Sequence, residues 1–228
     1  SCAEGINLIA DGYPFELGDE IITYVHEYPS NYYPWLQQKN RGAKLQELPN
    51  TNFLGAEFDQ LPLAWSMNDL ERLVTAKTKI IALSHVQFCS GYAADLKSLA
   101  DFCSSKGIDL VLDAAQSLGC MPLYPEELGI SAVVSSGWKW LLGPLGSGIL
   151  FTSEHFRKKL RPVWPGPGMM RQGDDFLNHA WNPHESSLRF EYSTKSFSGA
   201  LGLARSIEKV QLEKGMDAIW SQVLRLRE

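Results

Sequence analysis

The stretch Ser135–Gly148, SSGWKWLLGPLGSG, places a single charged residue, Lys139, between two tryptophans in a glycine-rich segment. A cation is costly to bury, so a lone lysine in apolar surroundings indicates an amine that is paired, neutralised or covalently occupied. The alternative is a lysine that extends its ammonium group to water along an apolar stem. The residues around this stretch are needed to decide between the two.

Short apolar, β-branched runs on both sides of this stretch are typical of buried strands. They occupy residues 21–25, 79–84, 108–113, 131–136 and 148–153. Helical patterns lie between them at residues 31–42, 66–76 and 92–107, the second with Ser66 or Asn68 as its N-cap. Strand, helix and strand in this order predict right-handed βαβ units. We therefore expect an α/β fold with a mostly parallel sheet flanked by helices.

The sequence also predicts an amphipathic helix at residues 92–107 and a long loop at residues 161–190. In residues 92–107, one apolar face is formed by Tyr92, Leu96, Leu99 and Cys103, and Gly107 stands where a C′ glycine ends a helix. Residues 161–190 are rich in Pro, Gly, His and Trp without any period. They predict a long surface or active-site loop.

Composition narrows the class of function. The 228 residues are 44% hydrophobic and 21% charged, with a net charge of -5, which leaves no basic surface for nucleic acid or an anionic membrane. There is no apolar run of about 18 residues and no signal-peptide pattern, so we expect a cytoplasmic protein that acts on small molecules. The cysteines have neither C-x-x-C spacing nor nearby histidines, so no metal site or disulfide is predicted. They are Cys2, Cys89, Cys103 and Cys120.

The carboxyl ends of parallel strands, where such sheets bind ligands, select the candidate site. Asp113 ends the run 108–113, and Ser136 ends the run 131–136, three residues before Lys139. Taken alone, Asp113 could cap a helix or pair with a cation. The small Ala114 and Ala115 after it would let a flat ligand approach, and Gln116 offers an amide. A carboxylate and a lysine are the groups that pyridoxal phosphate chemistry needs most.

Five segments in this order resemble the class V aminotransferase superfamily. They are EGINLIA (4–10), EYPSNYYPW (27–35), LDAAQSLG (112–119), SSGWKWLLGPLGSGIL (135–150) and LRFEYST (188–194). This superfamily of fold-type I pyridoxal phosphate enzymes includes cysteine desulfurases, selenocysteine lyases and isopenicillin N epimerase-like proteins. The resemblance implies a large cofactor-binding domain at residues 1–197. It also implies that residues 198–228 begin a helical connection to a C-terminal domain.

The resemblance implies a role for each matching residue. Lys139 would hold the cofactor as an internal aldimine and move the α-proton of an amino-acid substrate, and Asp113 would keep the pyridine nitrogen protonated. Gln116 would bind the phenolic oxygen, and Tyr28 would stack on the ring. The phosphate would be held by Ser136 and by the backbone N–H groups of Cys2 and Ala3 at a helix N-terminus. Thr194 would reach the phosphate of a neighbouring subunit, which implies a homodimer.

Several positions depart from the family pattern. Tyr28 and Trp138 stand where histidines are usual, and Trp138 could still donate its indole N–H to the phosphate. Phe88 replaces an asparagine, and Gln87 could substitute for it. Cys2 and Ala3 replace threonines but keep their backbone amides. Together these changes leave the expected cofactor binding largely intact, but they count against the cysteine desulfurase reaction itself.

Some alternatives stay open at this stage. Tyr28 could be a core aromatic, and His85 fits a hydrogen-bonded strand end better than a catalyst. Cys89 is given no role. The chain lacks a starting methionine and ends within a helical pattern, so we expect a fragment whose substrate-carboxylate arginine lies beyond Glu228. If the protein is an enzyme, its reaction could be transamination, Cβ–S cleavage or epimerisation. The alternative to an enzyme is a non-catalytic fragment or degenerate paralogue that keeps the fold as a binding or scaffold module.

Overall fold

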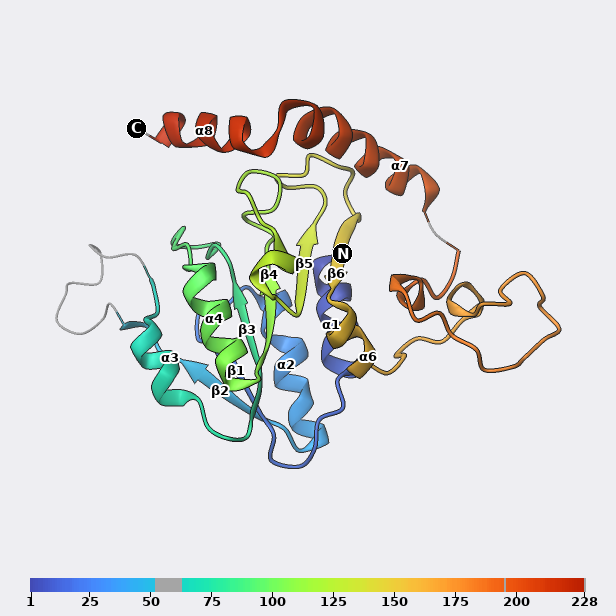
Figure 1. Cartoon of the computed structure of the whole chain (residues 1–228), viewed down its shortest axis with the longest axis horizontal. Helices are drawn as coiled ribbons and strands as arrows, with labels where there is room; N and C mark the ends of the chain where they lie inside the picture. Colours follow the sequence, from blue (N-terminus) through green and yellow to red (C-terminus); the bar gives the residue numbers. More distant parts are fainter. Residues whose placement is uncertain (52–62, 195, 228) are drawn as a thin grey trace.

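The computed structural model describes residues 1–51, 63–194 and 196–227, and its centre is a six-stranded sheet (Figure 1). The strands are β1 (Glu20–Tyr24), β2 (Lys44–Leu48), β3 (Thr78–Ser84), β4 (Asp109–Asp113), β5 (Ala132–Ser136) and β6 (Gly148–Thr152). Their order is β2-β1-β3-β4-β5-β6, with every neighbouring pair parallel except β5 and β6. The predicted mostly parallel α/β fold is confirmed.

Helices cover both faces of this sheet. One face carries α1 (Cys2–Gly12), α2 (Tyr33–Gln37) and α6 (Glu154–Lys159), and the other carries α3 (Met67–Leu73), α4 (Leu96–Lys106) and α5 (Pro125–Leu128). Alternate strand residues supply the two cores, because successive side chains point to opposite faces. Ile80 and Val111 belong to the α1 side, whereas Ile81 and Leu112 belong to the α4 side. Burial on both faces explains the uninterrupted apolar runs.

Helix α4 starts later than the periodicity predicts. The carboxylate of Asp95 accepts hydrogen bonds from the backbone N–H groups of Lys97 and Ser98 at 3.1 and 3.2 Å, which makes Asp95 the N-cap. The predicted start at Tyr92 is therefore wrong, although Tyr92 still packs against the same core. The predicted end is correct, since Gly107 adopts φ 66° directly after the last turn.

Two other predictions from pattern need correction. The helix expected over residues 31–42 is split into α2 and the 3₁₀ turn η2 (Gln38–Arg41), preceded by the 3₁₀ turn η1 (Pro29–Asn31). Strand β2 was not predicted, because its sequence KLQEL lacks an apolar run. Among the described strands it lies at the edge of the sheet, where charged residues are typical, and pairs with β1.

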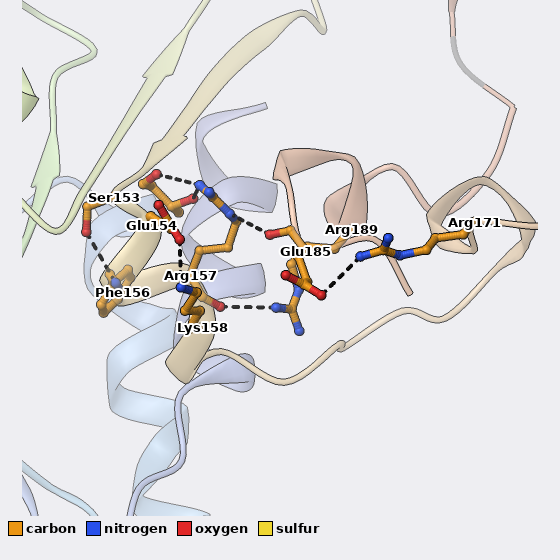
Figure 2. A network of polar contacts seen from close by, with 9 residues as sticks. Ser153, Glu154, Phe156, Arg157, Lys158, Arg171, Glu185 and Arg189 are labelled. Atoms are coloured by element: carbon orange, nitrogen blue, oxygen red, sulfur yellow. Dashed lines mark hydrogen bonds and ion pairs between the residues drawn. The ribbon is translucent and has the colours of Figure 1, made fainter. Parts of the chain in front are cut away.

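Residues 161–190 form the predicted irregular segment, with only the short turns η4 (Pro167–Met169) and η5 (Ser187–Phe190) among the described residues. Figure 2 shows how this segment is fastened to α6. The Arg157 guanidinium donates to the Glu185 carbonyl at 2.9 Å, and Arg189 donates to the carbonyls of Arg157 and Leu160 at 3.2 and 2.9 Å. Arg189 thereby caps the C-terminal end of α6.

The last part of the chain is helical, as the sequence predicts. Helix α7 (Phe197–Ser206), the π-helical turn η6 (Ile207–Leu212) and α8 (Met216–Arg227) run across one end of the domain (Figure 1). The boundary at residue 197 and a connection to a further domain stay predictions. Among the described residues, no helix combines the length and the apolar character that crossing a bilayer requires.

Candidate active site

A cavity of about 160 Å³ lies where β3, β4 and β5 end. Eight of the nine predicted site residues line it: Cys2, Ala3, Tyr28, Asp113, Gln116, Ser136, Trp138 and Lys139. They come from three places, the start of α1, the turn after β1, and the carboxyl ends of β4 and β5 with the loop beyond. The fold therefore gathers residues that are up to 137 positions apart, from Cys2 to Lys139.

Asp113 is the buried acid of this cavity, with 4% of its surface exposed. Its Oδ1 accepts the backbone N–H of Ala115 at 2.8 Å, and its Oδ2 accepts the thiol of Cys2 at 3.3 Å. Burial raises the pKa of Asp113, and these two donors and the charge of Lys139 oppose that rise. A cation beside Oδ2 would stabilise the ionised form further.

Lys139 stands on the loop between β5 and β6, and the backbone of this loop is tightly folded. Its carbonyl accepts the N–H of Leu142 at 2.9 Å, and Gly137 donates to the Ser147 carbonyl at 2.8 Å. A Cβ added at Gly137 would lie 2.4 Å from the Ser147 hydroxyl oxygen and 3.1 Å from the Ser147 carbonyl carbon, so a larger residue there would force the Ser147 side chain to move. The loop is also tied to η6, because Gln211 Nε2 donates to the Trp140 carbonyl at 3.0 Å.

The lysine is less enclosed by its neighbours than the sequence suggests. Lys139 is half-buried, Trp138 is 50% exposed and Trp140 is 43% exposed, and Trp140 does not line the cavity. The amine faces aromatic rings from two elements, with Nζ 5.6 Å from the centre of the Tyr28 ring and 5.7 Å from that of Trp138. The predicted apolar surroundings of Lys139 thus consist of aromatic rings that leave the lysine partly exposed.

Another part of the cavity lining offers hydrogen-bond donors that are suited to an anion. Helix α1 begins at Cys2, so the N–H groups of Cys2 and Ala3 belong to its first turn, whose amides have no acceptor within the helix. The Ser136 hydroxyl lies in the same cavity, is buried, and has no hydrogen-bond partner among the described residues. A buried hydroxyl without a partner beside a helix N-terminus is chemically suited to a phosphate oxygen.

Tyr28 is not a core aromatic, since 44% of its surface is exposed and its ring lines the cavity. Phe88 lines the cavity as well, and the two rings meet edge to face with their centres 5.2 Å apart. Gln87 is buried outside the cavity lining, and its Nε2 donates to Glu27 at 2.8 Å, so it does not take the place of an asparagine in the cavity.

The remaining candidates lie outside this cavity. Thr194 is exposed and borders a separate pocket together with Glu4 and Tyr192, so any contact with the phosphate would have to be made in another subunit. His85 is buried at the end of β3, with its pKa lowered to about 4 by burial and its Nδ1 without a partner among the described residues. The predicted hydrogen-bonded strand-end histidine is seen in its backbone, whose N–H donates to the Asp113 carbonyl at 2.9 Å, and not at Nδ1. Cys89 is exposed.

Sequence reasoning missed Ser84 and Ser30, which also line the cavity. Ser84 is the last residue of β3, so the rule of carboxyl strand ends would have selected it. Ser30 lies in the turn η1 and carried no signal. In the described ranges, no group of three or more His, Cys, Asp and Glu side chains could hold a metal ion.

The chain is an α/β protein with a mostly parallel sheet. At the carboxyl edge of this sheet, a candidate ligand cavity lies between the lysine loop and the start of α1. The Aminotransferase class-V family model matches residues 1–228, and the chain belongs to that family. A probable cysteine desulfurase of Pyrococcus abyssi is 31% identical over 98% of this chain and 53% of its own length.

Solved structures agree with this assignment. The cysteine desulfurase CsdA from Escherichia coli superposes with a TM-score of 0.79 and 27% identity, over 91% of this chain and 50% of that protein. A mutant of C-DES, described with glycine covalently linked to its PLP cofactor, shares the fold at a TM-score of 0.84 and 20% identity, over 96% of this chain and 56% of that protein. The chain spans about half the length of the relatives it matches.

Proposed function

We propose that the protein to which this chain belongs is a pyridoxal-phosphate-dependent enzyme that acts on an amino acid. The observation that carries the proposal is the convergence of Asp113, Ser136 and Lys139 on one cavity with the N-terminus of α1. A non-catalytic binding module is less well supported, because it gives no reason for a buried carboxylate and a lysine to face the same space.

The residues present fit this cofactor. The unpartnered Ser136 hydroxyl and the N–H groups of Cys2 and Ala3 would hold the phosphate. The buried Asp113 carboxylate would pair with the ring nitrogen, and Gln116 would donate to the phenolic oxygen. Tyr28 would cover one face of the ring. All of these groups line the same cavity.

When bound, pyridoxal phosphate supplies an electron sink for the electron pair left by a broken bond at the substrate's α-carbon. Lys139 would hold the cofactor through its side-chain amine. Once the substrate's amine has taken its place on the cofactor, the freed Nζ of Lys139 would accept the substrate's α-proton and return it. Asp113, held in place by the N–H of Ala115, would stay ionised beside a protonated ring nitrogen and so keep that proton in place.

The reaction outcome is the finer part of the proposal. The names of the relatives favour cleavage of the Cβ–S bond of a sulfur-containing amino acid over transamination and epimerisation. Tyr28 stands where the family usually has a histidine and has no imidazole to act as an acid. Any acid needed for Cβ–S cleavage would therefore come from another residue. The exposed position of Thr194 supports a homodimer in which it binds the phosphate of the partner's site.

Exchange of the α-proton tests the proposal, because this step is common to all three outcomes. In D₂O with pyridoxal phosphate, proton NMR should show loss of the α-proton signal of at least one natural amino acid. Lys139→Ala should abolish the exchange, whereas the exposed Lys106→Ala should not. Tight cofactor binding without exchange for any amino acid would favour the binding-module alternative.

A further inference from the structure

Glu27 is a buried carboxylate that lies directly behind the candidate active site. It follows β1, is only 7% exposed and does not line the cavity. Its Oε1 accepts the backbone N–H of Ser84 at 2.7 Å and Nε2 of Gln87 at 2.8 Å, and its Oε2 accepts the Ser84 hydroxyl at 2.5 Å. One side chain thus joins the turn after β1 to the turn after β3.

Each of the joined turns carries an aromatic ring of the cavity wall. Tyr28 directly follows Glu27, and Phe88 directly follows Gln87. The two rings pack edge to face with an interplanar angle of 76°, and the Tyr28 ring faces Lys139 Nζ. The Glu27 hydrogen bonds therefore lie one residue behind each ring of the Tyr28–Phe88 pair.

Neither ring is held by deep packing. Tyr28 and Phe88 are 44% and 47% exposed, so apolar burial alone leaves both rings considerable freedom. The groups behind them are fixed, because Gln87 is 1% exposed and Ser84 is 5% exposed. The buried polar contacts are therefore the rigid part of this wall.

Keeping an acid at this position is costly, which points to a specific use. Burial raises the pKa of Glu27, the nearby charge of Asp113 adds to the rise, and the donors from Ser84 and Gln87 oppose it. An apolar residue would avoid the cost of burial but would leave the Ser84 N–H without its acceptor. The two acceptor oxygens of this one side chain satisfy three donors at and after the end of β3, the Ser84 N–H, the Ser84 hydroxyl and the Gln87 amide.

We propose that Glu27 is a positioning residue, whose hydrogen bonds to Ser84 and Gln87 fix the Tyr28–Phe88 pair over the Lys139 side of the cavity. This inference rests on the proposed function insofar as the pair covers a bound pyridoxal phosphate. It deepens that function by assigning the geometry of the cavity wall to a residue that touches neither ligand nor lysine.

The consequence is a rigid aromatic cover. A ring that stacks on a flat ligand contributes most when its orientation is set before binding, because less conformational entropy is then lost. Loosening the Glu27 contacts should therefore weaken ligand binding through Tyr28. It should have little effect where the Tyr28 ring is already absent.

The experiment uses the longest natural form of the protein that contains this chain. Gln87→Met removes one donor to Glu27 at nearly constant volume, and Gln37→Met on the exposed surface of α2 is the matched control. Glu27→Leu removes the acceptor, while Glu27→Gln keeps an oxygen for the Ser84 N–H and can donate to the Ser84 hydroxyl. Pyridoxal phosphate affinity is measured by fluorescence titration in Tyr28 and Tyr28→Ala backgrounds, with thermal unfolding in parallel.

A second readout needs no cofactor. Tyrosines are replaced by 3-fluorotyrosine, and the ¹⁹F resonance of residue 28 is assigned by its loss in Tyr28→Phe. We expect Gln87→Met and Glu27→Leu to shift or broaden this resonance, and Glu27→Gln and Gln37→Met to leave it near its original position. Should Glu27→Leu fail to fold, Gln87→Met carries the test alone.

For affinity, we expect Gln87→Met to weaken pyridoxal phosphate binding about tenfold with Tyr28 present and less than about twofold with Tyr28→Ala. Equal weakening in both backgrounds, or an unchanged residue-28 resonance in Gln87→Met, would overturn the positioning role. Absence of cofactor binding by the wild-type protein would overturn the proposed function, and the fluorine readout would still decide whether Glu27 orders Tyr28.

Discussion

Replacing Asp113 by asparagine is predicted to stabilise the cofactor-free protein while it weakens cofactor binding and catalysis. Asparagine keeps an oxygen that can accept the Ala115 N–H, which Asp113 Oδ1 now accepts at 2.8 Å, but it carries no charge. Burial is the main cause of the raised pKa of Asp113, so the ionised form is disfavoured in the folded state. The wild-type protein therefore gives up folding free energy at neutral pH to keep this charge.

The difference in unfolding free energy between Asp113→Asn and the wild-type protein depends on pH. The folded-state pKa of Asp113 lies above the unfolded value of 3.8, so folded protein binds more protons between the two values and wild-type stability falls as pH rises through that window. Below 3.8 both side chains are neutral and the difference should vanish. Above the folded-state pKa, we expect Asp113→Asn to unfold with a free energy about 2 kcal/mol higher, or about 4–8 °C higher in Tm.

Urea unfolding of the two cofactor-free proteins at pH 7 and near pH 4 measures this difference. In the presence of pyridoxal phosphate and a substrate, α-proton exchange should fall at least about a hundredfold in Asp113→Asn, equivalent to about 2.7 kcal/mol. The reasoning is refuted if Asp113→Asn loses stability at pH 7 while its exchange rate stays at the wild-type value. That result would make Asp113 a structural acceptor with no part in the chemistry.

Three further predictions concern single positions. Burial lowers the pKa of His85 to about 4, so the folded state disfavours the protonated imidazole. The free energy of unfolding should therefore fall by about 3 kcal/mol as pH falls from 6.5 to 4, and urea titrations of His85→Leu should not show this loss. Ser136→Ala should change the free energy of unfolding by less than about 0.5 kcal/mol, because the hydroxyl has no partner among the described residues, yet weaken pyridoxal phosphate binding about tenfold in fluorescence titrations. Gly137→Ala should destabilise the protein by about 1–3 kcal/mol in chemical denaturation, because its Cβ would lie 2.4 Å from the Ser147 hydroxyl oxygen; an unchanged midpoint would show that the lysine loop yields at little cost.

The central strands could be predicted because each is buried on both faces, which leaves a continuous apolar signal such as KIIALS in β3. β2 could not, because its sequence KLQEL has no apolar run and only its pairing with β1 makes it a strand, whereas β6 at the other edge keeps the apolar sequence GILFT. The start of α4 was misplaced for a related reason. The capping hydrogen bonds of Asp95 decide the start, and the apolar period continues through Tyr92 regardless.

The sequence predicts the strand-end residues of the candidate site but not the residues that support them. Asp113, Ser136 and Lys139 lie at or beyond strand ends, and topology alone brings such positions together. The role of Glu27 is invisible in sequence, because its partners Ser84 and Gln87 lie 57 and 60 residues away along the chain. The exposure of Trp140 was also not foreseen, since its surroundings depend on where the loop after β5 folds.

Identification of the lysine that reacts with the cofactor tests the central claim most directly. The protein is incubated with pyridoxal phosphate, reduced with borohydride, digested and mapped by mass spectrometry. We predict one reduced adduct, on the peptide that contains Lys139, and its loss in Lys139→Ala. A reduced adduct on a different lysine, or full occupancy by cofactor without any lysine adduct, would contradict the account.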